Sequence, residues 1–280
     1  MRTIAPIVAL ITAAVCGLAV LGPDRAAAEP FVPYEDWHTA DHIRGDRWNG
    51  FADSAQEFHR TVKEQKLSMY LRKEGATVSD VGTSPLIQNR LFLASGALVT
   101  QIETEAKVTN AVVTGCAANP APSSIRPVAL QLIRFGDGPA NPPGVLTGDY
   151  LARVHLFRTS DSLDAPGLLR AAGIFVHCLD PGCAASTVLS SVAFPDPVPV
   201  GKTVRLQLVW DAANNQFLFG VDDNVLAIPY PAAANARPSS NPLADVRQNA
   251  VLANCMAGRT LADGVAEVGA VSTNAAAVIP

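Results

Sequence analysis

The stretch VRLQLVWDAANNQFLFGVDDN, residues 204–224, decides the fold prediction. Apolar side chains recur at every second position from Val204 to Trp210, and again from Phe217 to Val221. Successive side chains of a strand point to opposite faces, so each run predicts a strand with one apolar face. The Asp-Ala-Ala-Asn-Asn segment between them favours a turn, because Asp and Asn tolerate left-handed conformations. Residues 204–221 therefore predict an antiparallel hairpin that packs Trp210 and its face against a core.

The same alternation recurs along most of the chain, bounded each time by Gly and Pro. The runs lie at residues 66–72, 91–108, 128–135, 149–158, 173–178 and 264–271. Short strands between turn signals predict an all-β sandwich or barrel. No repeat of about 20–50 residues is present, which disfavours a solenoid or a propeller. The Pro-rich loops are short enough to connect strands, so residues 29–280 are predicted to form a single domain.

The first 28 residues have the pattern of a secretory signal peptide. Arg2 precedes a long apolar run, and the small residues Ala26–Ala28 precede Glu29 as the cleavage site. A retained membrane anchor is the alternative, but the run contains Pro6 and is barely long enough to span. Lipid attachment at Cys16 is disfavoured because the apolar run continues beyond it. We expect an exported protein, periplasmic or extracellular, with no membrane span after cleavage.

Charge and motifs exclude several functional classes. The chain has 21 basic and 25 acidic residues and a net charge of −4. With no run rich in Lys or Arg, this balance argues against nucleic-acid binding. The sequence also contains no Gly-rich phosphate loop, no Gly-x-Ser-x-Gly elbow and no serine–lysine acylation motif.

Four cysteines follow the signal peptide, and an even number in an exported chain favours disulfides. The segment CLDPGC brings Cys178 and Cys183 together across a Pro-Gly turn. By elimination, Cys116 then pairs with Cys255. A zinc site formed by His177, Cys178 and Cys183 is the alternative, but it lacks an obvious fourth ligand, so no metal site is predicted.

The hairpin also carries a resemblance to a known family. A strand ending in Trp-Asp, a short polar turn and Phe-x-Phe-x-Val-Asp resemble the concanavalin A-like lectin/glucanase jelly roll, and in particular laminin-G-like modules of bacterial exported proteins. The segments DHIRGDRW (41–48), EFHRTVKEQKLSMYLR (57–72), ANC (253–255) and GVAEVGAV (264–271) fit in the same order. The resemblance covers most of residues 34–273 and implies a two-sheet antiparallel jelly-roll sandwich. Calcium is the only cofactor that it suggests.

In that fold, ligands commonly lie across a concave sheet, which defines the candidate binding residues. Polar side chains share a face at alternate positions in three predicted strands. We expect them to converge into a groove of mixed charge, although they are equally typical of a solvated sheet face. The candidates are Glu103, Glu105, Arg153, His155, Arg205 and Gln207.

Two of these candidates offer a route to catalysis. Retaining glucanases of the fold carry Glu-x-Asp-x-x-Glu, and Glu103 and Glu105 are spaced so that their Cα atoms lie roughly 6.5–7 Å apart. Carboxyl groups about 5–9.5 Å apart can serve as a catalytic pair. The match lacks the third acid, however, and Lys107 follows, whose charge would depress a neighbouring carboxyl pKa.

The histidines allow two further interpretations. His38 and His42, with Asp36 and Asp41, have metal-ligand side chains, but they lie in a segment without periodicity. His155 and His177 lie in predicted strands and are expected to face one another, and a lyase would need such a residue as a base.

These observations favour a non-catalytic binding or envelope-interaction module, lectin-like if it binds a small ligand, with a carbohydrate or a cell-envelope protein as partner. The alternative is a glycan-cleaving enzyme on the concave sheet, either a hydrolase using Glu103 and Glu105 or a lyase using His155 with Arg153. A structural part of a larger surface assembly is a third class.

Overall fold

The computed structural model describes residues 29–278 apart from 39–40, 54–56, 76–85, 117–120, 138–140, 143, 236 and 256–257. The predicted signal peptide, residues 1–28, lies outside the described residues. The strands are β1 (Val32–Glu35), β2 (Trp48–Asp53), β3 (Glu57–Lys63), β4 (Lys66–Glu74), β5 (Ile87–Leu93), β6 (Gln101–Thr114), β7 (Ser124–Gly136), β8 (Asp149–Thr159), β9 (Leu168–Cys178), β10 (Ser186–Ala193), β11 (Val198–Pro199), β12 (Thr203–Asp211), β13 (Gln216–Val221), β14 (Asn224–Pro229), β15 (Arg237–Val251) and β16 (Leu261–Thr273). Three short 3-10 helices accompany them: η1 (Gly96–Leu98), η2 (Ala232–Asn235) and η3 (Ala275–Ala277).

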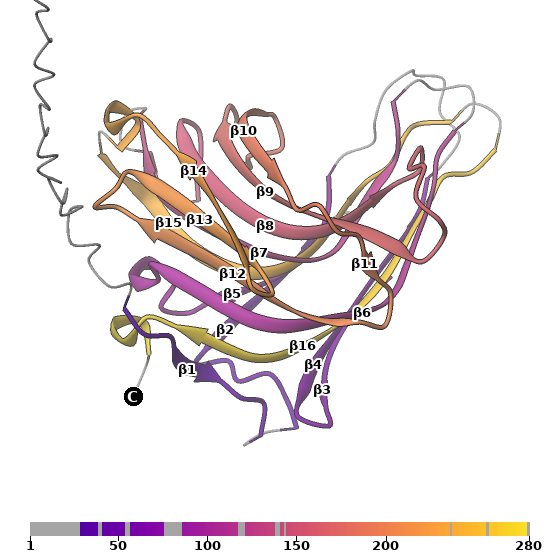
Figure 1. Ribbon diagram of the computed structural model, residues 1–280, viewed down its shortest axis with the longest axis horizontal. Helices are drawn as coiled ribbons and strands as arrows, with labels where there is room; N and C mark the ends of the chain where they lie inside the picture. The colour runs from indigo at the N-terminus through magenta and orange to yellow at the C-terminus, as the bar shows by residue number, and fades with distance from the viewer. Residues whose placement is uncertain are drawn as a thin grey trace, which may run out of the picture.

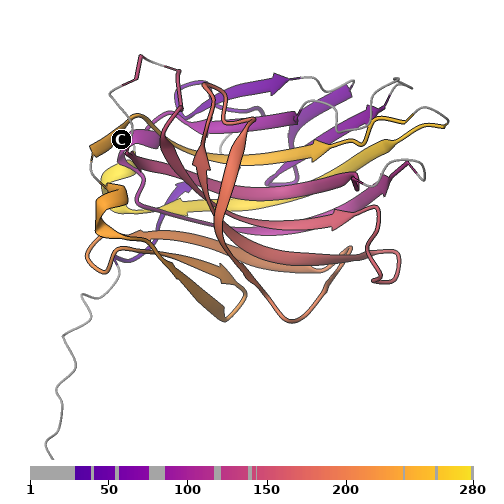
Figure 2. The ribbon, with the colours of Figure 1, turned by 90° about the horizontal axis from the view of Figure 1, so that it is seen from above.

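In the described part of the chain the strands form two eight-stranded antiparallel sheets. Sheet A has the order β14-β13-β12-β6-β16-β4-β3, with β1 paired to β16. Sheet B has the order β10-β9-β8-β7-β15-β5-β2, with β11 paired to β9. Figures 1 and 2 show the long curved strands of the two sheets running side by side along the molecule. The predicted all-β jelly-roll sandwich is confirmed.

The hairpin at residues 204–221 forms as predicted, from β12 and β13. Val204, Leu206 and Leu208 are buried between the sheets, and Trp210 packs partly against the same core. The turn contains left-handed Asn215, and the Asp211 carboxylate accepts a hydrogen bond from the Asn214 backbone at 3.2 Å. The polar turn therefore closes the hairpin, while its apolar face builds the core.

Aromatic side chains join the two sheets at one end of the core. Phe135, from sheet B, stacks on Phe217 of sheet A with ring centres 5.9 Å apart, and lies 4.7 Å from the ring of Tyr230. Tyr230 also accepts a hydrogen bond from the indole of Trp210 at 2.8 Å. Buried aromatic rings contribute both apolar area and ring–ring contacts, so this group is a main source of cohesion between the sheets.

The alternating run at residues 91–108 is not one strand. It contains the end of β5 in sheet B, the 3-10 helix η1, and the start of β6 in sheet A. The chain crosses between the sheets at Ser95–Thr100, where the side chain of Asn274 accepts a hydrogen bond from the Thr100 backbone at 2.8 Å. Small residues in ASGAL permit this crossing, and periodicity alone did not separate it from a strand.

Both predicted disulfides are present, Cys116–Cys255 and Cys178–Cys183. The first joins the chain before β7 to the chain after β15, and the second closes a turn after β9. Over the described residues, no helix is long and apolar enough to cross a membrane.

The two disulfides should contribute unequally to stability. Cys116–Cys255 spans 139 residues and Cys178–Cys183 spans 5. Chain-entropy arguments credit the long loop with about 5 kcal/mol and the short one with about 2 kcal/mol. Urea denaturation of the two double Cys→Ala variants should therefore show the larger loss for Cys116/Cys255. Equal losses would contradict the entropic account.

Candidate functional site

The outer face of sheet B is polar and yet largely buried over its central strands β5, β15, β7 and β8. Figure 1 shows β7, β8 and β9 bowed so that this face lies on the inside of the curve. Polar side chains alternate there with apolar ones that point into the core between the sheets. We call the following set the arginine cluster: Arg90, Arg126, Arg153 and Arg247, with Gln88, Gln131, Asp245, Asn249 and His155.

The cluster is assembled by strand register from four neighbouring strands. Arg90 of β5 lies opposite Arg247 of β15, and Asp245 of β15 lies opposite Gln131 of β7. Gln131 in turn lies opposite Arg153 of β8. Residues directly opposite in an antiparallel pair share a face, so these side chains converge although they are far apart in sequence.

Hydrogen bonds link the cluster into a network. Arg153 donates to the Gln131 side-chain oxygen from Nε at 3.1 Å and from Nη2 at 2.7 Å, and Arg247 donates to the same oxygen. Arg247 also donates to the side-chain oxygen of Gln88. Arg90 forms a buried ion pair with Asp245, with its Nε 2.8 Å from Oδ2.

Among the residues that the structure describes, several polar atoms of the cluster are buried without a hydrogen-bond partner. They are Nε of Arg126 and Arg247, Nδ1 of His155, Oδ1 of Asp245, and both side-chain amide atoms of Asn249. Arg247 is 2% exposed and His155 is 3% exposed. Such groups cost free energy unless a protein group, a water molecule or a ligand pairs with them.

Burial changes the protonation equilibria in the cluster. Desolvation, with the charge of Arg126, lowers the pKa of Arg153 to about 9. Desolvation also lowers the pKa of Arg247, and neighbouring Arg90 and Arg153 lower it further. The pKa of His155 falls well below its usual value through burial and the charges of Arg126 and Arg153. His155 is therefore neutral at pH 7, and burial together with the two arginine charges opposes its protonation.

Small residues flank His155, whereas larger ones cover the other side of the cluster. Across the strands His155 lies between Ala129 and Ala172. Elsewhere, Leu86, Leu146 and Cys183 border a cavity of about 10 Å³ among the cluster side chains. A sugar ring is larger than this space, so sugar binding requires these covering residues to move.

The structure does not bring the six predicted binding residues together. Arg153 and His155 lie in the cluster on sheet B. The other four lie on the outer face of sheet A, where Gln207 donates a hydrogen bond to Glu103, and Glu105 lies opposite Arg205 in the strand register. The sandwich core separates the two sets.

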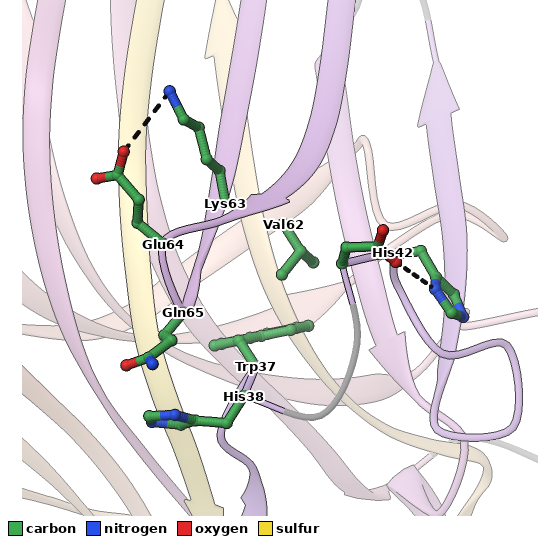
Figure 3. A pocket seen from close by; sticks show the side chains of 8 residues that line it. Trp37, His38, His42, Val62, Lys63, Glu64 and Gln65 are labelled. Carbon is green, nitrogen blue, oxygen red and sulfur yellow. Dashed lines mark hydrogen bonds and ion pairs between the residues drawn. The ribbon is translucent and has the colours of Figure 1, made fainter.

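The predicted histidine pairs also lie apart. His155 is on the outer face of sheet B, whereas His177 stacks on Tyr150 and binds Asp137 at 3.1 Å. His38 and His42 border an open hollow of about 640 Å³. Figure 3 shows that their rings do not point toward one another, and His42 pairs with Asp41 at 3.1 Å. Within the described ranges, no three His, Cys, Asp or Glu side chains gather as a metal site would require.

Sequence reasoning missed seven residues of the cluster. Six of them are polar residues within otherwise apolar stretches, IQNRLFL (87–93), VALQLIRF (128–135) and ADVRQNAV (244–251), and Arg126 lies just before the second stretch. Polar residues within a strand normally indicate a face in contact with water. The burial of this face becomes apparent only in the folded structure. The missed residues are Gln88, Arg90, Arg126, Gln131, Asp245, Arg247 and Asn249.

No family model matches this chain, and no curated protein matches it. Among solved structures it is similar to the catalytic domain of an endo-1,3-β-glucanase (laminarinase) from Thermotoga petrophila, with 13% identity, 89% of this chain and 100% of that chain covered, and a TM-score of 0.44. It is similar to LamA from Z. galactanivorans in complex with laminaritriose and laminaritetraose, with 10% identity, coverages of 86% and 97%, and a TM-score of 0.45. It is also similar to the laminarinase catalytic domain from Thermotoga maritima, with 15% identity, 86% of this chain and 98% of that chain covered, and a TM-score of 0.42.

These findings correct the function expected from the sequence. The comparisons favour the alternative, a glycan-cleaving enzyme, over the expected non-catalytic, lectin-like binding or envelope-interaction module, since the similar structures are described as a glucanase and laminarinases. None of these three structures is described as laminin-G-like. At these identities and TM-scores, no residue role is carried over from those enzymes to this chain.

The single carboxylate of the cluster should be important for stability. Asp245 is fully buried against Arg90, and removing one partner of a buried ion pair costs about 3–5 kcal/mol. Asp245→Asn should therefore lower the urea midpoint strongly. Asp223→Asn is the matched control, because Asp223 forms an exposed ion pair with Arg205. Similar midpoints for the two variants would contradict the buried-pair interpretation.

Proposed function

We propose that this protein is an exported glycan-cleaving enzyme whose active site is the arginine cluster on the outer face of sheet B. The observation that carries the proposal is a buried, neutral histidine, His155, with an unpartnered Nδ1 beside Arg126 and Arg153. The fixed charges of Arg126 and Arg153 can stabilise negative charge in a transition state, and a bound anion that offsets them would allow the neutral imidazole to accept a proton.

The position of the cluster supports the same proposal. It lies on the inner side of a curved sheet, a surface on which an extended chain of sugars can lie. The outer face of sheet A, in contrast, leaves Glu105 exposed and Glu103 half-buried, with Glu103 accepting a hydrogen bond from Gln207. Active-site roles therefore fall to His155 and Arg153 rather than to the two glutamates.

The proposed location is the periplasm or the extracellular space. The N-terminal residues have the signal-peptide pattern described above, and two disulfides are typical of oxidising compartments. A polysaccharide partner outside the cytoplasm fits both features.

A cleavage assay tests the proposal. The disulfide-bonded protein is incubated with a panel of neutral and acidic polysaccharides, and new reducing ends are measured. His155→Gln should lower the rate on the cleaved polysaccharide by roughly 10²–10⁴-fold, the usual contribution of a proton-transfer group. The double variant Glu103→Gln/Glu105→Gln should retain the rate, because those carboxylates lie on the other sheet.

Absence of cleavage on every polysaccharide would reject the enzyme proposal. Loss of activity in the glutamate variant, with retention in His155→Gln, would move the active site to sheet A. Circular dichroism of each variant checks that the fold is retained.

A further inference from the structure

The arginine cluster carries an excess of buried positive charge. It contains four guanidinium groups and one carboxylate, Asp245, which pairs with Arg90. In the part of the chain that the structure describes, no ion pair joins Arg126, Arg153 or Arg247 to a carboxylate. The partners of Arg153 and Arg247 are the neutral amide oxygens of Gln131 and Gln88, which accept hydrogen bonds but supply no charge.

Buried charge without a counter-charge costs folding free energy. A bound anion would supply that counter-charge to the cluster. Arg153 is 9% exposed, and the more deeply buried Arg247 has an unpartnered Nε. Arg126 adds a second unpartnered Nε, and Asn249 adds an unpartnered amide donor with 0% exposure. Three nitrogen donors without acceptors therefore belong to one cationic cluster.

We infer that the substrate is an acidic glycan and that the carboxylate of a uronic acid unit binds to Arg126, Arg153 and Arg247. The inference rests on the proposed function and deepens it by naming the substrate class. A carboxylate has two oxygens that accept bidentate hydrogen bonds from guanidinium groups, and its charge compensates the excess. Neutral glucans offer neither the charge nor the acceptor geometry.

The same residues define how such a substrate is cleaved. The proton at C5 of a uronate is acidified by the adjacent carboxylate, and more so when arginines hold that carboxylate. Neutral His155 removes this proton, the electron pair forms a C4=C5 double bond, and the C4–O bond breaks. The departing oxygen takes the proton back from His155, so the step consumes no water and no oxidant. Hydrolysis by paired carboxylates fits less well, since Asp245 is the only carboxylate in the cluster.

Gln131 is the positioning residue of the cluster. Its side-chain oxygen accepts hydrogen bonds from both Arg153 and Arg247. Gln131 therefore holds the two guanidinium groups close to each other. Without a ligand this arrangement is repulsive, and a carboxylate between the two guanidinium groups relieves it.

Binding measurements test the substrate class separately from cleavage. The probes are oligogalacturonate, the same oligomer with its carboxyls reduced to alcohols, and a sulfated neutral glycan. Calorimetry should show binding of oligogalacturonate alone. Arg153→Met and Arg247→Met should each weaken it by about 10–100-fold, the worth of a hydrogen bond to a charged group. Arg205→Met, on the exposed face of sheet A, is the matched control and should bind normally.

Equal binding of the reduced oligomer, preference for the sulfated glycan, or unchanged affinity in both cluster variants would overturn the inference. Arg153→Lys serves if Arg153→Met does not fold, and it should bind weakly because it loses the planar fork. An ultraviolet band from the new C4=C5 double bond should accompany cleavage.

The two proposals fail in different ways. Cleavage of a neutral glycan without the ultraviolet band would leave the enzyme proposal standing and reject the uronate inference. Arginine-dependent binding of oligogalacturonate without any cleavage would support the uronate inference and reject the enzyme proposal.

Discussion

The structure depends on apolar side chains at every second position packing between two sheets. Phe135 from sheet B and Phe217 from sheet A meet in this layer, and every strand around them must keep its alternation to maintain the contact. A shift of one residue in any central strand would expose its apolar side chains and bury its polar ones. Core packing therefore fixes which side chains reach the outer faces, including Arg153 and His155 on β8.

The two outer faces obey the same alternation but have different environments. On sheet A the outward residues are solvated and pair with each other, as Lys107 does with Glu267 at 3.7 Å. On sheet B most residues of the arginine cluster are buried, and of its four arginines only Arg90 forms an ion pair with the one carboxylate, Asp245, among the described residues. Exposed polar side chains cost little folding free energy, whereas buried charges without partners cost much. Such a cost is expected at a functional site, which favours the outer face of sheet B as the site.

Much of the fold was predictable from local pattern. The hairpin at 204–221, most strands and both disulfides follow from alternation, turn residues and cysteine spacing. Local pattern did not place the crossing at Ser95–Thr100, because the apolar residues there continue the period. It also found only Arg153 and His155 of the cluster. Arg90 and Arg247 become neighbours only because β5 pairs with β15, a contact between residues 157 positions apart in the chain.

A crystal structure of the protein with an oligogalacturonate tests the central claim most directly. The account predicts a uronate carboxylate within hydrogen-bond distance of Arg153 and Arg247, with C5 facing His155 and with Leu86, Leu146 or the Cys178–Cys183 turn displaced. An oligosaccharide bound instead at Glu103 and Glu105 on sheet A, with the arginine cluster unchanged, would contradict it.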